Sequence, residues 1–153
     1  MNRLLVAVFS IFIFSTASAG DGLVTKQSGF GASETLDRLE AVLKKKGITI
    51  FARVSHAGGA EGVGIELRPT ELLIFGNPKL GSHFFTSNQT AGIDLPMKAL
   101  AWEDADGQVW LTYNDPQYIA DRHGIADRGE IVSKMTGALD KMTNAAIGEP
   151  AKQ

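Results

Sequence analysis

A β-hairpin near the middle of the chain constrains the fold more than any other feature. Two runs of alternating apolar and polar residues, Lys98–Glu103 and Gln108–Asn114, flank the turn sequence Asp104-Ala105-Asp106-Gly107. An Asp-Gly pair between two such runs favours a tight antiparallel connection. The pattern therefore predicts two paired strands, which need a larger sheet around them because an isolated hairpin is only marginally stable in water.

The second strand of the hairpin presents two different surfaces. Val109, Leu111 and Tyr113 share one face because side chains alternate along a strand. Trp110 and Thr112 share the other face. Trp110 therefore either covers a second layer or lies partly exposed at an interface.

Periodicity and helix caps predict the other elements. Ser33 is expected to cap the first helix, Asp115 to cap a short helix that ends at Gly124, and Asp127 with Glu130 to form a capping box. Together these elements predict an α+β domain over residues 20–148, with helices packed on a single sheet of four to five strands. The further strands are Gly22–Gln27, Ile48–Ser55 and Thr70–Phe75, and the helices are 33–46, a weakly helical 79–89, 116–124 and a last helix ending at Gly148. The apolar stripe predicted for the last helix consists of Ile131, Val132, Met135, Leu139, Met142 and Ala146.

Two segments fit no regular element clearly. Ala57–Gly64 contains four glycines and is either a mobile loop or a poorly capped short helix. The glycine motifs of nucleotide-phosphate sites are absent from it. Ala91–Pro96 is too short for regular structure, and its Asp94 either acts as an acid or base at a pocket mouth or, as we favour, caps nearby backbone N–H groups.

The N-terminus has the layout of a secretory signal peptide. Arg3 precedes an apolar run, Leu4–Phe14, and the small residues Ala17-Ser18-Ala19 follow. The apolar run is shorter than the roughly 20 residues that span a bilayer. We expect residues 1–19 to be cleaved and the mature protein to be periplasmic or secreted, without a membrane partner after processing.

Composition narrows the function classes. Removing residues 1–19 from the 153 leaves 134, enough for one domain with its own core. The absence of cysteine excludes thiol catalysis, cysteine metal sites and covalent haem attachment. Without Arg3, 14 basic residues face 17 acidic ones, a net charge of −3 that gives no reason to expect a nucleic-acid partner. Residues 149–153 are expected to be disordered.

Clusters of polar residues provide only weak evidence for a site. His56, His83 and His123 lack the spacing of helical metal pairs, so a shared metal or haem site with Met97 would need the fold to assemble it. Independent surface histidines and no cofactor are expected. Lys44–Lys46 is interpreted as a solvated helix end rather than an anion-binding patch.

Three turn segments resemble a known family. They are Phe75-Gly76-Asn77-Pro78, Gly92-Ile93-Asp94-Leu95-Pro96 and Tyr113-Asn114-Asp115-Pro116. With them, residues 23–142 resemble the family called domain of unknown function 302. The resemblance implies a small, often dimeric α+β fold without an established activity, and it supplies no catalytic residues.

Two functional hypotheses follow. The first is an exported, non-catalytic binding or interaction module that forms a homodimer and binds a small molecule. The second is a small periplasmic hydrolase or isomerase that uses Asp94 with His56 or His83, which convergence of these side chains in one pocket would favour. No residue is assigned a catalytic or metal-binding role. The candidate ligand-contacting residues are His56, Asn77, His83, Asp94 and Trp110.

Overall fold

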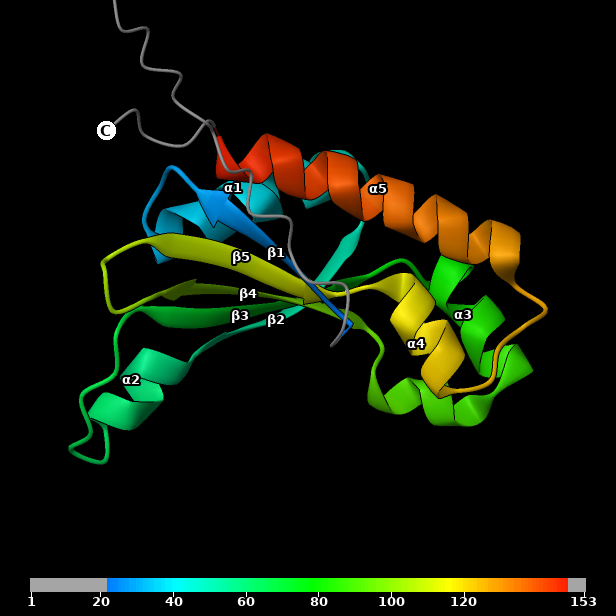
Figure 1. The fold of residues 1–153 in the computed structure, drawn as a ribbon, viewed down its shortest axis with the longest axis horizontal. Coiled ribbons are helices and arrows are strands. Elements are labelled where there is room, and N and C mark those ends of the chain that lie inside the picture. Colours follow the sequence, from blue (N-terminus) through cyan, green and yellow to red (C-terminus); the bar gives the residue numbers. More distant parts are fainter. Residues whose placement is uncertain (1–21, 149–153) are drawn as a thin grey trace, which may run out of the picture.

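Five strands form one antiparallel sheet in residues 22–148, the part of the chain that the computed structural model describes (Figure 1). Their order is β1-β5-β4-β3-β2, so the predicted hairpin lies within the sheet. The predicted α+β architecture is confirmed. The expected signal peptide, residues 1–19, and the expected disordered tail, 149–153, lie outside the described residues. The strands are β1 (Leu23–Ser28), β2 (Thr49–Ser55), β3 (Thr70–Gly76), β4 (Met97–Glu103) and β5 (Val109–Asn114).

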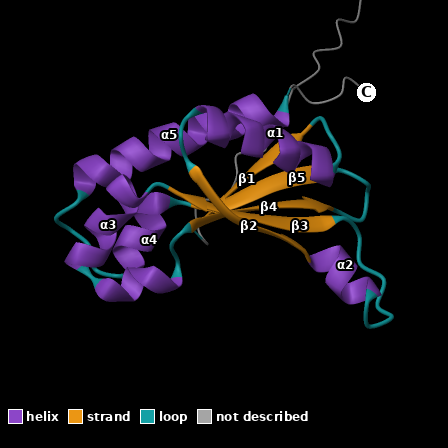
Figure 2. Ribbon diagram, turned by 180° about the vertical axis from the view of Figure 1, so that it is seen from behind, coloured by secondary structure: helices purple, strands orange, loops and turns teal. Residues whose placement is uncertain are grey.

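The helices cover one face of the sheet and both of its ends. Helices α1 and α5 lie across one side, which we call the covered face, and the opposite side is the open face (Figure 2). Helix α2 lies at one end, whereas α3, η1 and α4 gather at the other. None of the helices in residues 22–148 is long and apolar enough to cross a membrane. They are α1 (Ala32–Lys45), α2 (His56–Glu61), α3 (Pro78–Ser87), the 3₁₀ helix η1 (Gln89–Ile93), α4 (Pro116–Arg122) and α5 (Gly129–Ile147).

The main core lies between the covered face and the two long helices. Leu73 and Phe75 of β3 and Leu111 of β5 are buried there, because alternate side chains of each strand point to the same face. Helix α1 contributes Leu36, Leu39 and Leu43. The predicted apolar stripe of α5 is confirmed, except that Ile131 is only partly buried. Its buried members are Val132, Met135, Leu139, Met142 and Ala146.

Two predicted helix caps are wrong by one or two positions. Helix α1 is capped by Gly31 rather than Ser33, and the Ser33 hydroxyl instead accepts a hydrogen bond from Arg53. Helix α5 begins after Arg128, without a side-chain cap, and Asp127 instead contacts Ser87 and Arg128. Tertiary partners attract both polar side chains away from the helix ends. Asp115, by contrast, caps α4 at Gln117 N as predicted.

Both uncertain segments contain short helices. The glycine-rich segment forms α2, and the Ser55 hydroxyl caps it by accepting from Gly58 N at 3.0 Å. Of the segment expected to be irregular, residues up to Ile93 belong to η1, which Asn88 caps by accepting from Thr90 N at 3.0 Å. Side-chain caps therefore stabilise both short helices, which lack long apolar stripes.

Candidate functional site

An apolar pocket of about 170 Å³ lies where the sheet, α3 and α5 meet. Aromatic and aliphatic side chains form most of its wall, and Asn77 and Ser82 are the residues with polar side chains among those that line it. Such a lining suits an apolar molecule with few hydrogen-bonding groups. The principal wall residues are Phe51, Phe75, Leu80, Phe85, Met135 and Leu139.

The turn from β3 into α3 shapes the pocket. Asn77 accepts a hydrogen bond from Lys79 N at 3.0 Å, and Pro78 occupies the first helical position, so the chain enters α3 directly. Gly76 allows close packing here, because a Cβ at this position would stand 3.3 Å from Pro96 Cβ and 3.4 Å from Phe51 Cε2. The turn thus brings the end of β3 and the start of α3 into one wall.

An irregularity in β2 brings a third element to the pocket. The register between β2 and β3 shifts between Ile50 and Ala52, which leaves Phe51 outside the regular pairing. Phe51 lines the pocket while 52% of its surface stays exposed. A large aromatic side chain therefore lies at the pocket's border with solvent.

Of the predicted ligand-contacting residues, Asn77 alone lines this pocket. His56 begins α2, at the opposite end of the sheet from α3 (Figure 1). His83 is exposed on α3, and Trp110 lies on the open face. The predicted residues therefore do not converge in one site.

Asp94 has a partner that the sequence hypotheses did not assign to it. Its carboxylate accepts from His123 Nε2 at 2.6 Å and lies 3.4 Å from Arg122 Nη1. The prediction that the Asp94 side chain caps local backbone N–H groups is therefore wrong, and no hydrogen bond joins its carboxylate to His56 or His83 among the described residues. His123, expected on the surface, has a side chain only 7% exposed. Asp94 and His123 are 29 positions apart, so only packing of η1 against α4 reveals the pair.

The surroundings of this pair indicate a structural link. Thr90 Oγ1 lies 2.8 Å from His123 Nδ1, which gives a hydroxyl, imidazole and carboxylate in sequence. The same hydroxyl also lies 2.9 Å from Asn88 Oδ1, and Asn88 Nδ2 donates to His123 O at 2.8 Å. None of these residues lines the apolar pocket. The contacts join η1 to the end of α4.

The open face carries two tryptophans near the hairpin turn between β4 and β5. Trp102 and Trp110 are directly paired across β4 and β5, and their rings stack with centroids 6.5 Å apart. Trp102 Nε1 donates to Thr112 Oγ1 at 2.9 Å, and Trp110 Nε1 donates to Asp104 Oδ2 at 2.7 Å. The hydrogen bond from Trp110 lowers the pKa of Asp104. Both indole N–H groups are thus satisfied within the chain, which leaves the half-buried rings free for apolar contact.

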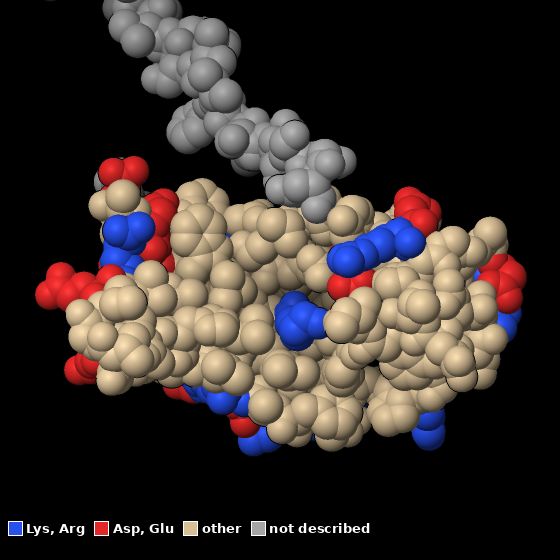
Figure 3. All heavy atoms as spheres, turned by 90° about the horizontal axis from the view of Figure 1, so that it is seen from below, with Lys and Arg blue, Asp and Glu red and all other residues tan. Residues whose placement is uncertain are grey.

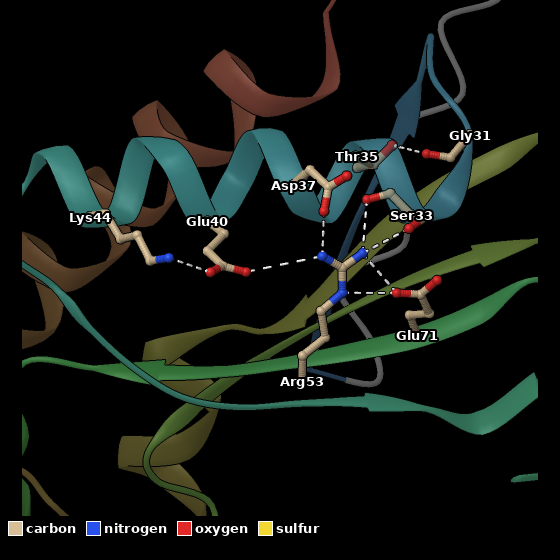
Figure 4. A network of polar contacts seen from close by, with 8 residues as sticks. All are labelled: Gly31, Ser33, Thr35, Asp37, Glu40, Lys44, Arg53 and Glu71. Atoms are coloured by element: carbon tan, nitrogen blue, oxygen red, sulfur yellow. Dashed lines mark hydrogen bonds and ion pairs between the residues drawn. The ribbon is translucent and has the colours of Figure 1, made fainter. Parts of the chain in front are cut away.

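On the covered face, a network of polar side chains lies at the β2 edge of the sheet. Arg53 of β2 bonds Asp37 and Ser33 of α1 and Glu71 of β3 (Figure 4). Burial acts to lower the pKa of Arg53, but hydrogen bonds and charges of Asp37 and Glu71 outweigh it and raise the pKa. Nearby, Lys44 pairs with Glu40 at 2.6 Å. This network joins α1 to the edge of the sheet. None of its residues lines the apolar pocket.

In residues 22–148, no group of three or more His, Asp or Glu side chains is arranged to hold a metal ion. The three histidines belong to different parts of the fold: His56 begins α2, His83 lies in α3 and His123 follows α4. The apolar pocket and the open face are therefore considered first as places where a partner could bind.

Curated relatives match most of this chain but only part of their own length. One is a fluoride-specific ion channel, FluC 1, from Brucella suis biovar 1 (strain 1330), 43% identical over 129 residues, which are 84% of this chain and 51% of that protein. Another FluC 1, from Brucella abortus biovar 1 (strain 9-941), is also 43% identical, with 84% and 48% covered. The chain thus spans about half the length of the curated relatives it matches.

A solved structure and a family model agree on the fold. An uncharacterized conserved DUF302 protein from Bacillus stearothermophilus has a crystal structure that superposes with a TM-score of 0.74 at 20% identity, covering 82% of this chain and 98% of that one. At this identity the likeness shows the fold alone. The model of the family described as "Domain of unknown function DUF302" matches residues 24–142. The turns around Asn77, Asp94 and Asp115 and the five-stranded sheet that they connect are therefore those of a member of the DUF302 family, to which this chain belongs.

Proposed function

We propose that the protein is an exported, non-catalytic interaction module that forms a homodimer through the open face of its sheet. The observation that supports this most is the composition of that face. Half-buried or exposed apolar side chains occupy most of it in β2, β3 and β4, whereas Thr25, Gln27 and Thr112 make the β1–β5 side more polar. Lys98 is the charged residue among its strand positions in the described chain. Figure 3 views this side, where residues other than Lys, Arg, Asp and Glu cover most of the surface and a positively charged group lies near the middle. The apolar members are Val54, Leu72, Ile74, Leu100, Trp102 and Trp110.

An antiparallel sheet can leave one face in water when that face carries polar side chains. Here the outward positions of β3 and β4 include Leu72, Ile74 and Leu100, so the strands are apolar on both sides. Contiguous apolar surface on a soluble domain is typical of an interaction site. A second layer over this face would complete the sheet as a two-layered sandwich.

The two ends of the open face support a second copy as that layer. Beyond one end, the segment that follows α2 exposes Val63, Ile65 and Leu67 at 74%, 61% and 47%. At the other end, η1 and α4 expose Ile93 and Tyr118 at 73% and 40%. Both Figure 1 and Figure 2 place α2 and the α4 region at opposite ends, on the side away from α5. A two-fold axis across the sheet pairs each end with the opposite end of the partner, as an isologous contact requires.

The area is sufficient for a stable dimer. Five strands about 4.8 Å apart, each about 20 Å long, give a flat face of roughly 500 Å² per copy. Two such faces bury on the order of 1,000 Å², and contacts at both ends bring the total to the roughly 1,200 Å² or more of specific interfaces. An interface formed by the sheet alone would bury an area at the lower limit for specific interfaces, so the dimer also needs the contacts at both ends.

The enzyme alternative has less support. Asp94 contacts His123 rather than His56 or His83, and neither member of the pair lines the pocket. A general acid or base needs to reach a bound substrate within hydrogen-bond distance or through one water. Ion-channel activity is also outside the proposal, since the matched segment is about half of the FluC relatives and the apolar pocket does not suit a strongly hydrated anion.

Export rests on the N-terminal sequence. Arg3, the apolar run after it and the small residues up to Ala19 support cleavage by signal peptidase. Expression in a bacterium followed by fractionation should place the protein in the exported fraction with an intact mass lacking residues 1–19. An exported protein that retains Met1–Ala19, or one confined to the cytoplasm, contradicts the proposal.

Sedimentation velocity across a concentration series tests the dimer. Wild-type protein should form dimers, and Ile65→Lys or Ile93→Glu should each shift the species toward monomer, because each places a charge in one end contact. Both residues are largely exposed, so the monomer should keep its fold and thermal stability. A mixture of the two single variants should recover dimer, since the new Lys and Glu meet in the heterodimer.

A matched control uses an exposed position away from the open face. Gly137→Lys on α5 adds a charge where no heavy atom lies within 4 Å of a Cβ, and it should leave the dimer unchanged. A wild-type protein that is monomeric at every concentration, or a dimer insensitive to both end variants, would show that a second copy does not cover this face.

A further inference from the structure

A second hollow adjoins the apolar pocket and has a different character. It has a volume of about 730 Å³ and lies between the C-terminal end of α1 and the outer surface of α5. It shares Ile48, Asn77, Leu80, Ala138 and Met142 with the apolar pocket. The two hollows therefore share a wall. We call the first the apolar half and the second, whose lining includes lysines, the polar half of this region.

Three lysines line the polar half: Lys46 from the end of α1, and Lys134 and Lys141 from α5. The α5 lysines are seven positions apart, which places them on the same side of a helix. No ion pair involves any of the three among residues 22–148, whereas the neighbouring Lys44 is paired with Glu40. Asp140, next to Lys141 in the chain, has its carboxylate bound by Lys26 at 2.7 Å.

The clustering is informative because the whole chain is slightly acidic, with a formal net charge of −2. Three unpaired ammonium groups around one hollow repel one another, and an anion between them would offset that repulsion. The sequence predicts a solvated helix end at Lys44–Lys46. In the structure, these lysines have different surroundings. Lys44 pairs with Glu40 on the same helix, whereas Lys46 lines the hollow between α1 and α5.

We propose that this region binds an anionic amphiphile with a single alkyl chain. The chain lies in the apolar pocket against Phe75, Phe85 and Leu139, and the carboxylate or phosphate head group lies among the three lysines. Asn77, which lines both halves, has its Oδ1 bonded to Lys79 N and its amide N–H groups left to donate to the head group. Fatty acids and single-chain phospholipids share this chemistry. This inference is independent of the dimer, which uses the opposite face of the sheet.

Titration calorimetry with octanoate, decanoate and 1-decanol on the full mature protein tests the arrangement. Each added methylene should tighten alkanoate binding about fourfold until the pocket is full. Decanoate should bind more tightly than 1-decanol, and only decanoate binding should weaken as salt is raised, because the lysines are exposed to screening. Decyl phosphate in place of decanoate distinguishes a preference for phosphate head groups.

Variants separate the two halves. Gly81→Leu on α3 should weaken both decanoate and 1-decanol at least about tenfold, because Gly81 lines the pocket and a Cβ there meets only Phe85 Cε2, at 3.9 Å. Gly129→Leu, at an open position outside the pocket, is the control with the same change. Ala138→Trp blocks the pocket from the opposite wall if the α3 variant folds poorly.

The double variant Lys134→Ala/Lys141→Ala should weaken decanoate about tenfold and leave 1-decanol unchanged. Lys45→Ala/Lys79→Ala removes the same charge outside the hollow and should change neither affinity. Mass spectrometry of protein from the exported fraction then distinguishes a retained fatty acid from a phospholipid. Equal binding of decanoate and 1-decanol, no effect of chain length, or no loss in Gly81→Leu would each overturn the inference, whatever the oligomeric state.

Discussion

The two faces of the sheet are formed by alternate side chains of the same strands, but helices cover only one of them. On the covered face, Leu73 is fully buried, and the charged Arg53 and Lys26 find their partners on α1 and α5. On the open face, Leu72 and Trp110 are only half-buried, and neither of the long helices α1 and α5 lies on this side. The covered face therefore contributes to folding of the single chain, whereas the open face has apolar area left for association.

This difference separates two kinds of stability. Polar groups on the covered face link distant segments, as Lys26 of β1 does when it donates to Asp140, Thr143 and Asn144 of α5. Polar groups on the open face bond instead within the sheet and its hairpin turn, as Thr25 Oγ1 does with Thr112 Oγ1 at 3.0 Å and Trp110 with Asp104. Substitutions on the two faces should therefore change different measurements, which gives the following expectations.

The largest expected effect is Leu73→Ala, which removes a fully buried side chain from the covered face. It should lower the free energy of unfolding by about 2–5 kcal/mol, because the transfer loss and the cavity both destabilise the core. Urea denaturation measures it. The adjacent Leu72→Ala, on the open face, is the matched control and should cost about 1 kcal/mol or less in the monomer. Equal losses would show that the two faces are equally buried.

Lys26→Met should have an intermediate effect. The Lys26 side chain is 15% exposed and its Nζ donates to three α5 side chains at 2.7–2.8 Å. Losing these bonds should lower the free energy of unfolding by about 1–2 kcal/mol, the lower part of the range for hydrogen bonds to charged groups because Asp140 is exposed. Chemical denaturation with an unchanged midpoint would mean that the link contributes nothing.

Trp110→Ala tests whether the open face contributes to association more than to the stability of the monomer. The dimer dissociation constant should rise about tenfold or more, as for a large aromatic side chain that an interface buries. The monomer should lose only about 1 kcal/mol, from the stacking with Trp102 and the bond to Asp104. Sedimentation and denaturation of the same samples give both numbers. An unchanged sedimentation profile would count against an interface at Trp110.

The smallest effect concerns acid. The hydrogen bond from Lys26, more than any other influence, lowers the pKa of Asp140 below its ordinary 3.8. Because the pKa is lower in the folded chain, the ion pair's contribution is complete above that value and is lost as pH falls through the folded pKa. Stability measured below pH 3.8 should therefore decline less steeply in Lys26→Met than in wild type. Parallel curves would contradict the assignment.

Elements with strong local patterns were predictable. The Asp-Gly hairpin, the strand before Gly76, the cap at Asp115 and the apolar stripe of α5 all appear where the sequence places them. Each depends on residues within one or two turns of one another. The caps at Ser33 and Asp127 were wrong because both side chains bond to residues from other elements, which propensity within the helix does not include.

The candidate sites were less predictable for the same reason. Asn77 was chosen as the turn residue of a resembling segment, and it does line the pocket. The pairing of Asp94 with His123, and the grouping of Lys46 with Lys134 and Lys141, join residues that are far apart in the chain. Alternation along β5 did place Trp110 opposite the core, but only the sheet order shows that nothing from α1 or α5 covers it.

By itself, the sequence determined the α+β class, the strand faces and most helix positions, because these follow from periodicities and turns read over short distances. The tertiary structure alone decided which face stays open, where α3 and α5 leave a pocket, and which charges lack a partner. Those properties depend on how separate elements pack. Packing brings together side chains that are far apart in the chain, and their spacing in the sequence does not predict the contact.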